Sequence, residues 1–273
     1  MRRIFLILIL LLTACTTQSI EKESPINLRL TTTTSVNDSG LIEYLRPYIL
    51  EDLNINLEVV SLGSGAAIEA GQRGDADVLL VHSPSAEETF VQDGYGLKRS
   101  TFMYNFFVIV GPSSDPARII DLSAKDAFLK IFDTKSLFVS RGDNSGTHSK
   151  EKNIWKLTNL NYDELSIDTD FYLSSGSGMG NTLIMANEKQ AYTLTDLATY
   201  LSMQDKLDLE VIVSESSDLR NDYSIIVINP EKVENVDSVI ALKFEEWMLS
   251  DKALELIGEF GKEEYKQALF FTE

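Results

Sequence analysis

The segment LFVSRGDNSGTHSKEKNIWKL, residues 137–157, joins a short apolar run to a helical pattern through small polar residues. Residues 137–140 predict a buried strand, and apolar spacing of three and four over 147–158 predicts an amphipathic helix. The junction between them, RGDNSGT (141–147), has the Gly, Ser and Asp typical of a turn. The same order of strand, junction and helix recurs along the chain, so this segment indicates the fold class.

The periodicity predicts an α/β protein with mainly parallel sheets. The expected helices are 41–50, 121–132, 147–158, 180–189 and 236–257. The expected strands are 26–31, 57–61, 77–82, 106–111, 137–140, 170–174, 191–195, 209–214 and 224–229. Nine strands exceed the usual size of one compact sheet, so we expect two α/β lobes. Since no Pro/Gly linker separates them, we expect strands to join the lobes.

Four junctions share hydroxyl side chains and glycine-exposed backbone N–H groups at the start of a helix: 31–40, 63–65, 141–147 and 174–180. The unpaired amides and the positive end of the helix dipole favour an anion there. The carboxyl ends of strands in α/β sheets meet at one edge, where ligands bind. N-capping explains any one junction alone, but four of them with one arginine indicate an anion site.

Arg141 is the one positive side chain among these junctions, and its planar fork suits two oxygens of a tetrahedral oxyanion. Asp143 is expected either to orient Arg141 or to cap the following helix. Alternation along an extended chain lets only every second threonine of 31–34 face a ligand. The predicted oxyanion-binding residues are Thr33, Thr34, Ser35, Ser64, Arg141, Ser145, Gly146 and Thr147, with backbone N–H groups of Gly178 and Met179.

Charge and composition exclude several functions. The net charge of the 273 residues is −18, and without residues 1–14, which contain Arg2 and Arg3, it is −20. A protein with this large negative net charge does not attract nucleic acid or anionic lipid, which are also negatively charged. Two distant histidines, His82 and His148, and one cysteine leave few ligands for a metal. We expect no metal, no cofactor and no catalytic residue: no serine stands in GxSxG, which argues against a membrane-attached hydrolase.

The amino terminus resembles a bacterial lipoprotein signal. Residues 1–14 contain a basic start and the apolar run IFLILILLL (4–12), which is too short to span a bilayer. Cys15 follows Leu-Thr-Ala and is the only cysteine, so a lipid thioether accounts for it. Residues 15–25 are predicted as a tether. The resemblance implies an extracytoplasmic protein, lipid-anchored to the cell membrane at Cys15.

Six motifs are similar to those of the tungstate-binding proteins of bacterial ABC transporters. They are TTTS with SGL (32–41), GDADVLLVH (74–82), MYNFFVIVGP (103–112), SRGDNSGTHSKE (140–151), SGSGMGNTLIMANE (175–188) and AYTLTD (191–196). The resemblance implies a two-lobed, periplasmic-binding-protein-like (type II) fold whose lobes are joined by two crossing strands, near 104–110 and 222–228. Lobe one would comprise 26–105 and 226–273, and lobe two 106–225.

The resemblance further implies high-affinity capture of tungstate and its delivery to an ABC permease with its ATPase, by a monomer that is not an enzyme. From the residues alone, a phosphate- or molybdate-binding receptor and an oxyanion-sensing module remain open. The segment RxDxSGT at 141–147 also resembles the anion loop of phosphate-binding receptors.

Overall fold

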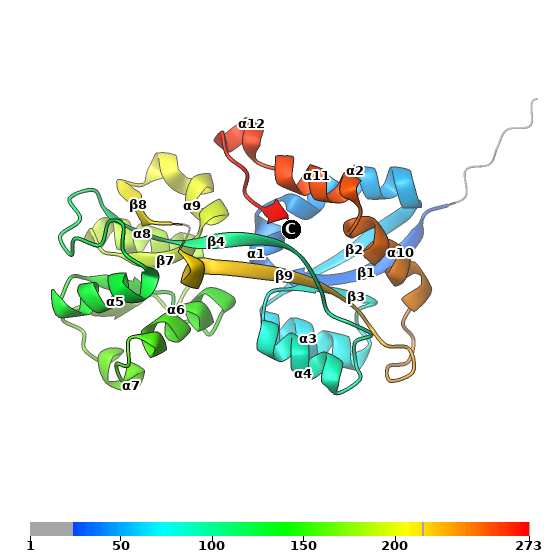
Figure 1. Ribbon diagram of the computed structural model, residues 1–273, viewed down its shortest axis with the longest axis horizontal. Helices are drawn as coiled ribbons and strands as arrows, with labels where there is room; N and C mark the ends of the chain where they lie inside the picture. The colour runs from blue at the N-terminus through cyan, green and yellow to red at the C-terminus, as the bar shows by residue number, and fades with distance from the viewer. Residues whose placement is uncertain (1–23, 215, 273) are drawn as a thin grey trace, which may run out of the picture.

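A computed structural model describes residues 24–214 and 216–272 of the chain, which form two α/β lobes joined by two long strands (Figure 1). The predicted architecture of two α/β lobes joined by two crossing strands is confirmed. Cys15 and the rest of the predicted signal lie outside the described residues.

Lobe one, on the right of Figure 1, is built on β1 (Ile26–Thr33), β2 (Ile55–Leu62) and β3 (Val78–Val81), which are parallel. Alternate side chains of β3 enter two different cores. Val78 and Leu80 belong to the first core, and Leu79 and Val81 belong to the second. The first core packs against α2 (Leu41–Leu53), α10 (Ser238–Met248) and α11 (Asp251–Glu259), and the second against α3 (Ser64–Arg73) and α4 (Pro84–Gln92). The short α1 (Thr34–Asp38) follows β1 directly, and α12 (Lys262–Tyr265) precedes β10 (Phe271–Thr272).

Lobe two contains β5 (Phe138–Ser140) paired with β6 (Tyr172–Ser174). Its β7 (Thr193–Asp196) and β8 (Leu209–Val213) pair with β4 (Ser100–Pro112). Residues of α5 (Ala124–Asp133), α6 (Gly146–Leu157) and α7 (Tyr162–Leu165) share one core. Residues of α8 (Met179–Lys189) and α9 (Leu197–Met203) belong to the cluster that continues into lobe one. Two 3-10 turns, Gln204–Lys206 and Ser217–Leu219, flank β8.

The two connecting strands are β4 (Ser100–Pro112) and β9 (Arg220–Val227), which run side by side between the lobes (Figure 1). Residues 100–106 of β4 pair with β9, and residues 107–112 pair with β7 and β8 in lobe two. In lobe one, β9 also pairs with β3 and β10 with β4. The carboxyl ends of β1 and β3 therefore lie beside the crossing strands.

Two expectations were wrong. Among the described strands, three pairings are parallel and five antiparallel, so the larger sheet is mixed, because β4 runs antiparallel to its neighbours in both lobes and β9 runs antiparallel to β3 and β4. The helix expected over 236–257 is two helices. The Ser250 side chain accepts a hydrogen bond from the backbone N–H of Ala253 and caps α11, so the chain turns between α10 and α11.

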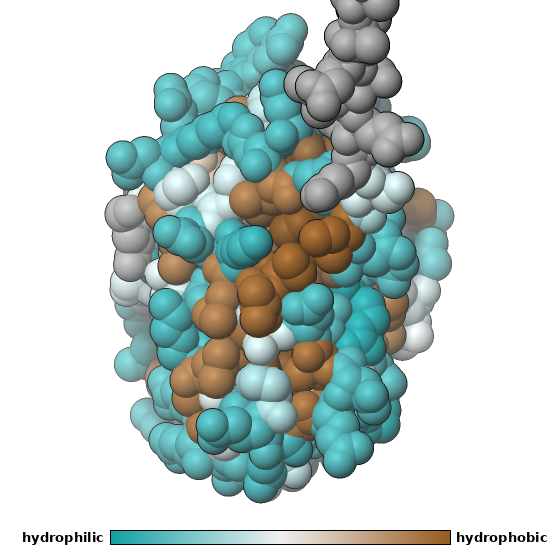
Figure 2. All heavy atoms as spheres, turned by 90° about the vertical axis from the view of Figure 1, so that its right-hand side faces the viewer, coloured by the Kyte–Doolittle hydropathy of each residue, from teal (hydrophilic) through white to brown (hydrophobic). Residues whose placement is uncertain are grey.

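The end of lobe one that is turned away from lobe two carries a band of apolar side chains (Figure 2). The helices at this end, α2 and α10, expose Leu50, Val239 and Leu242. The described chain also begins here, at β1. None of the described helices is long and apolar enough to cross a membrane.

Candidate functional site

A small cavity lies between the lobes at the carboxyl ends of β1 and β3. It is lined by Thr33, Thr34, Ser35, Leu62, Gly63, Ser64, His82, Phe107, Arg141, Ser145, Gly146, Thr147, Asp196, Asn221 and Tyr223. Eight of the ten predicted oxyanion-binding residues are in this wall, from segments up to 114 positions apart in the sequence. A wider cleft of about 650 Å³ adjoins it along α3, α4 and α6.

Three helices begin at the cavity. The first residues of α1, α3 and α6 are in its wall, and α1 and α3 have no side chain capping their free N–H groups. At α6, the Ser145 side chain accepts from the backbone N–H of His148, 3.3 Å away. The remaining first-turn amides have no helical acceptor. Two lobes thus present backbone donors to one small space, which suits an anion.

The threonine run divides between packing and the cavity. The Thr32 hydroxyl donates to the Leu80 carbonyl at 2.9 Å and is fully buried. Thr33 and Thr34 both line the cavity, because β1 ends at Thr33 and α1 begins at Thr34. Strict alternation therefore fails at the strand end, where the backbone changes direction.

Arg141 is held by Asp143 on the loop of residues 141–147, called here the arginine loop. Arg141 Nε donates to Asp143 Oδ2 at 2.8 Å, and the Ser145 backbone N–H donates to Oδ1 at 3.1 Å. Asp143 therefore both orients the guanidinium and supports the start of α6, the two roles that the sequence left open. Burial alone raises the pKa of Asp143, but the hydrogen bonds from Ser145 and the charge of Arg141 outweigh it and hold that pKa below its usual value.

His82, which the sequence did not place in the site, is the hub of a buried polar network. Asn221 Nδ2 donates to Asn105 Oδ1 and to the Tyr223 hydroxyl, so Asn221 Oδ1, 3.0 Å from His82 Nδ1, accepts from it. Nε2 of His82 then accepts from the Ser35 hydroxyl at 3.2 Å. Burial lowers the pKa of His82 to about 4, which keeps the ring neutral.

This network determines which groups in the cavity wall can donate a hydrogen bond to a ligand. Because the Ser35 hydroxyl donates to His82, Ser35 offers an anion its backbone N–H at the start of α1. The Tyr223 hydroxyl accepts from Asn221 and keeps its own proton for another acceptor at the cavity wall. A signal for His82 was present in the sequence, since it follows the apolar run VLLV at the carboxyl end of a predicted strand.

Asp196 is the carboxylate in the cavity wall, which the sequence did not predict; Asp143 is on the arginine loop but not in the wall. Its side chain accepts from the Thr199 backbone N–H at 2.9 Å and from the Thr199 hydroxyl at 2.7 Å, so it caps α9. Burial raises the pKa of Asp196, while Thr199 and the charge of Arg141 act in the opposite direction. Its oxygens are thus occupied within the protein and balance part of the charge of Arg141.

Gly178 and Met179 are not in the cavity wall. Met179 is buried in the core, and Gly178 is the N-cap of α8. The junction that contains them packs behind the arginine loop, where the Ser175 hydroxyl donates to the Arg141 carbonyl at 3.1 Å. Three of the four predicted junctions therefore meet at the cavity, and the fourth supports one of them.

The lobes are closed around the cavity. It has about 20 Å³ of accessible volume, room for about one water molecule, so the lobes must part for a larger ligand to enter. Among residues 24–214 and 216–272, no group of three or more His, Cys, Asp or Glu side chains is placed to hold a metal ion.

Comparison with known proteins agrees with this geometry. A family model described as a PBP superfamily domain matches residues 20–252. The tungstate-binding protein TupA of Peptoclostridium acidaminophilum is 48% identical over 244 residues, 88% of this chain and 84% of that protein. The structure of the tungstate-binding protein TupA from Desulfovibrio alaskensis G20 is 39% identical with a TM-score of 0.83, covering 91% of this chain and 99% of that one. The structure described as the tungstate ABC transporter from Geobacter sulfurreducens is 38% identical with a TM-score of 0.75, covering 86% and 98%.

Proposed function

Since the chain belongs to the PBP superfamily and, within it, to the family of the TupA tungstate-binding proteins, we propose that it captures tungstate in the cavity between its lobes. The bound form then delivers the anion to an ABC permease outside the cytoplasmic membrane. No bond is made or broken in this function. The observation that carries it is the meeting of three helix N-termini and Arg141 at one closed cavity.

The donor set favours a dianion that only accepts hydrogen bonds. Backbone N–H groups, hydroxyls and one guanidinium can donate to every oxygen of tungstate. The two carboxylates at the site, Asp143 and Asp196, already accept from protein groups. A phosphate that retains a proton would have to place it on an oxygen that already accepts from a protein group, and a buried proton left without an acceptor costs about 1–3 kcal/mol.

Capture requires that the anion stabilise the closed form over the open form. Donors from α1 and α3 belong to lobe one, and Arg141 with α6 belongs to lobe two. An anion held by both sets bonds fully only when the lobes are closed. The strands β4 and β9, which alone run between the lobes in the described part of the chain, are where the hinge motion would occur.

The proposal can be tested by isothermal titration calorimetry of the protein without its predicted signal and tether (residues 1–25). Sodium tungstate is titrated in competition with molybdate, sulfate and phosphate. We expect tungstate to bind most tightly, then molybdate, with sulfate and phosphate far weaker, and little change between about pH 6 and 8. Sulfate, like tungstate, is a dianion that only accepts hydrogen bonds, so its weaker binding must come from its smaller size. Phosphate that matches tungstate would contradict the proposal and make Asp143 or Asp196 a proton acceptor.

A further inference from the structure

The motif SRGDNSGTHSKE contains three buried polar residues that the proposed anion site does not use: Ser140, His148 and Glu151. Ser140 directly precedes the arginine loop, and His148 directly follows it. Glu151 lies one helical turn further along α6 and is 1% exposed. A carboxyl group buried behind the loop needs an explanation, since burial of an ionisable group costs free energy.

The Glu151 carboxyl accepts three hydrogen bonds. The Ser140 hydroxyl donates to Oε2 at 2.6 Å, and the Tyr172 hydroxyl and Trp155 Nε1 donate to Oε1 at 2.6 and 3.2 Å. Burial raises the pKa of Glu151 to about 7. A proton on Oε2 would reverse only the bond to Ser140, because Oε1 remains an acceptor for Tyr172 in either state.

A chain of hydrogen bonds leads from Tyr172 back to the arginine loop. The Tyr162 hydroxyl lies 2.9 Å from that of Tyr172 and 2.9 Å from His148 Nε2. On the other side of the ring, His148 Nδ1 accepts from the Asn144 backbone N–H at 2.9 Å. The chain thus connects a backbone amide of the arginine loop to Glu151 through three side chains.

We call this chain of hydrogen bonds, from the Asn144 backbone N–H through His148, Tyr162 and Tyr172 to Glu151, the relay. The groups at its two ends determine which partner donates in each hydrogen bond. A backbone N–H can only donate, so Nδ1 of His148 carries no proton and Nε2 does. Nε2 therefore donates to Tyr162, Tyr162 to Tyr172, and Tyr172 to the carboxyl. Burial holds the pKa of His148 below its usual value, so the ring is neutral as this pattern requires.

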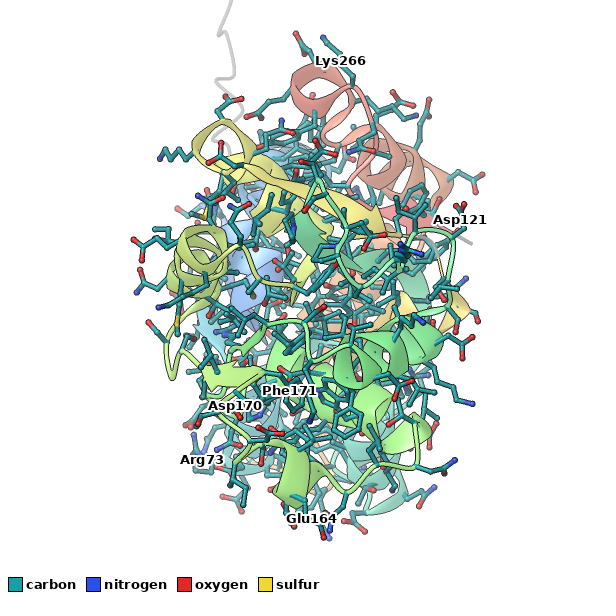
Figure 3. All side chains as sticks on the ribbon, turned by 90° about the vertical axis from the view of Figure 1, so that its left-hand side faces the viewer. Arg73, Asp121, Glu164, Asp170, Phe171 and Lys266 are labelled. Carbon is teal, nitrogen blue, oxygen red and sulfur yellow. The ribbon has the colours of Figure 1, made fainter. Side chains whose placement is uncertain are left out.

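We infer that Glu151 is a positioning residue of the oxyanion site, which holds both flanks of the arginine loop, one through Ser140 and the other through the relay that ends at His148. This inference rests on the proposed function, because it assigns the loop's placement to anion binding. Tyr172 lies in β6, and the preceding residue, Phe171, is fully buried among the packed side chains of lobe two, which holds this strand in place (Figure 3). By contrast, Glu164 of α7 reaches the surface.

The test cuts the relay at two successive links, with Tyr162→Phe, Tyr172→Phe and the double variant, and measures tungstate affinity by calorimetry. Each substitution keeps the ring and removes one hydroxyl. We expect each single variant to bind about fivefold more weakly. Since both cut the same chain, the double variant should bind no more weakly than the weaker single variant. Losses that multiply would mean independent structural effects and would overturn the inference.

Tyr200→Phe is the matched control. Tyr200 is a nearly buried tyrosine of lobe two, and its hydroxyl donates to the Leu209 carbonyl at 2.9 Å, away from the relay. It should leave affinity unchanged, and its effect on melting temperature shows what the loss of one buried hydroxyl does to the fold alone. Unchanged affinity in both relay variants, or an equal loss in Tyr200→Phe, would also overturn the inference.

Nitrogen NMR of the anion-free protein gives a readout that does not depend on binding. The chain has only two histidines, so both rings can be assigned. We expect the His148 Nε2 proton to exchange slowly in the wild type and fast in Tyr162→Phe; a proton on Nδ1 would disprove the relay. Wild-type protein with this NMR signature that binds none of the four oxyanions would instead refute the proposed function, and with it the assignment of the relay to anion binding.

Discussion

Gly146, the first residue of α6 in lobe two, lies against the ring of His82, at the end of β3 in lobe one: a Cβ at Gly146 would be 3.0 Å from His82 Cε1. This distance is shorter than about nine in ten real Cβ contacts, so the ring would have to move by a few tenths of an ångström. The ring is held by Asn221 and Ser35. This contact across the cleft exists only when the lobes are closed.

Gly146→Ala should therefore weaken tungstate binding without weakening the fold. Alanine is the better helix former, by about 1 kcal/mol in a helix interior, so α6 itself should not lose stability. Opposition to closure should reduce affinity by roughly five- to tenfold, and small-angle scattering should show a less compact bound form. Calorimetry and scattering check both.

Gly65→Ala is the control for this substitution. Gly65 is the second residue of α3 at the same cleft, but a Cβ there meets no atom within 4 Å. It should bind tungstate as the wild type does. Equal losses in the two variants would show that added bulk near the cleft, rather than the contact with His82, weakens binding.

Arg141→Ala should weaken oxyanion binding at least roughly tenfold. A charge-assisted hydrogen bond contributes on the order of 1.5–3 kcal/mol. Thr147→Ala, which keeps the backbone N–H at the start of α6, should lose less. The fold should persist, because Asp143 still accepts from the Ser145 backbone N–H. A folded Arg141→Ala protein with unchanged affinity in calorimetry would remove Arg141 from the site.

His82 makes the stability of the protein depend on pH on the acid side. Its pKa is about 4 when folded, against about 6.5 unfolded. Below about pH 6.5 the unfolded chain takes up a proton that the folded protein refuses, so this contribution lowers stability as pH falls from 6.5 towards 4. At pH 5 the penalty is about 2 kcal/mol.

His82→Gln removes this titration while other groups titrate as before. The difference in unfolding free energy between variant and wild type, from urea denaturation, should shift in favour of the variant by about 2 kcal/mol between pH 7 and pH 5. A difference that stays constant over this range would mean that His82 is not held neutral.

Cys15→Ala should release the protein from the membrane and leave its tungstate affinity equal to that of the wild type. Membrane fractionation and mass spectrometry of the mature amino terminus check this, and an unmodified terminus at another position would contradict it.

The sequence predicted buried strands better than surface helices. All nine expected strands overlap observed ones, because runs such as VLLV are buried on both faces. For α3 only the start was predicted, from the junction at 63–65, and not the extent: its sequence SGAAIEAGQR has two glycines, and its apolar side chains pack in the core that also contains Leu79 and Val81 of β3. Residues 100–103 of β4 were missed because their pairing with β9 spans more than a hundred positions.

The candidate site was predictable where local chemistry marks it. The junctions after β1, β2 and β5 combine glycine, hydroxyls and helix starts, and all three meet at the cavity. Asn221 and Tyr223 had no such mark, since they are part of an ordinary β-rich run and reach the cavity only because β9 crosses between lobes. Gly178 and Met179 show the limit of composition: their junction has glycine and hydroxyls, but it packs behind the arginine loop and does not line the cavity.

The division of β4 between two sheets limits how this protein can change in length. In lobe two, Phe107 and Ile109 enter one core, and Val108 and Val110 enter the other. Since side chains alternate along a strand, deletion of a single residue near position 106 would exchange these two pairs and turn every later contact to the opposite face. An insertion that is harmless in a surface loop would here exchange the cores that the following residues of β4 enter, so we expect the residue count from Ser100 to Pro112 to be among the least variable lengths in the family.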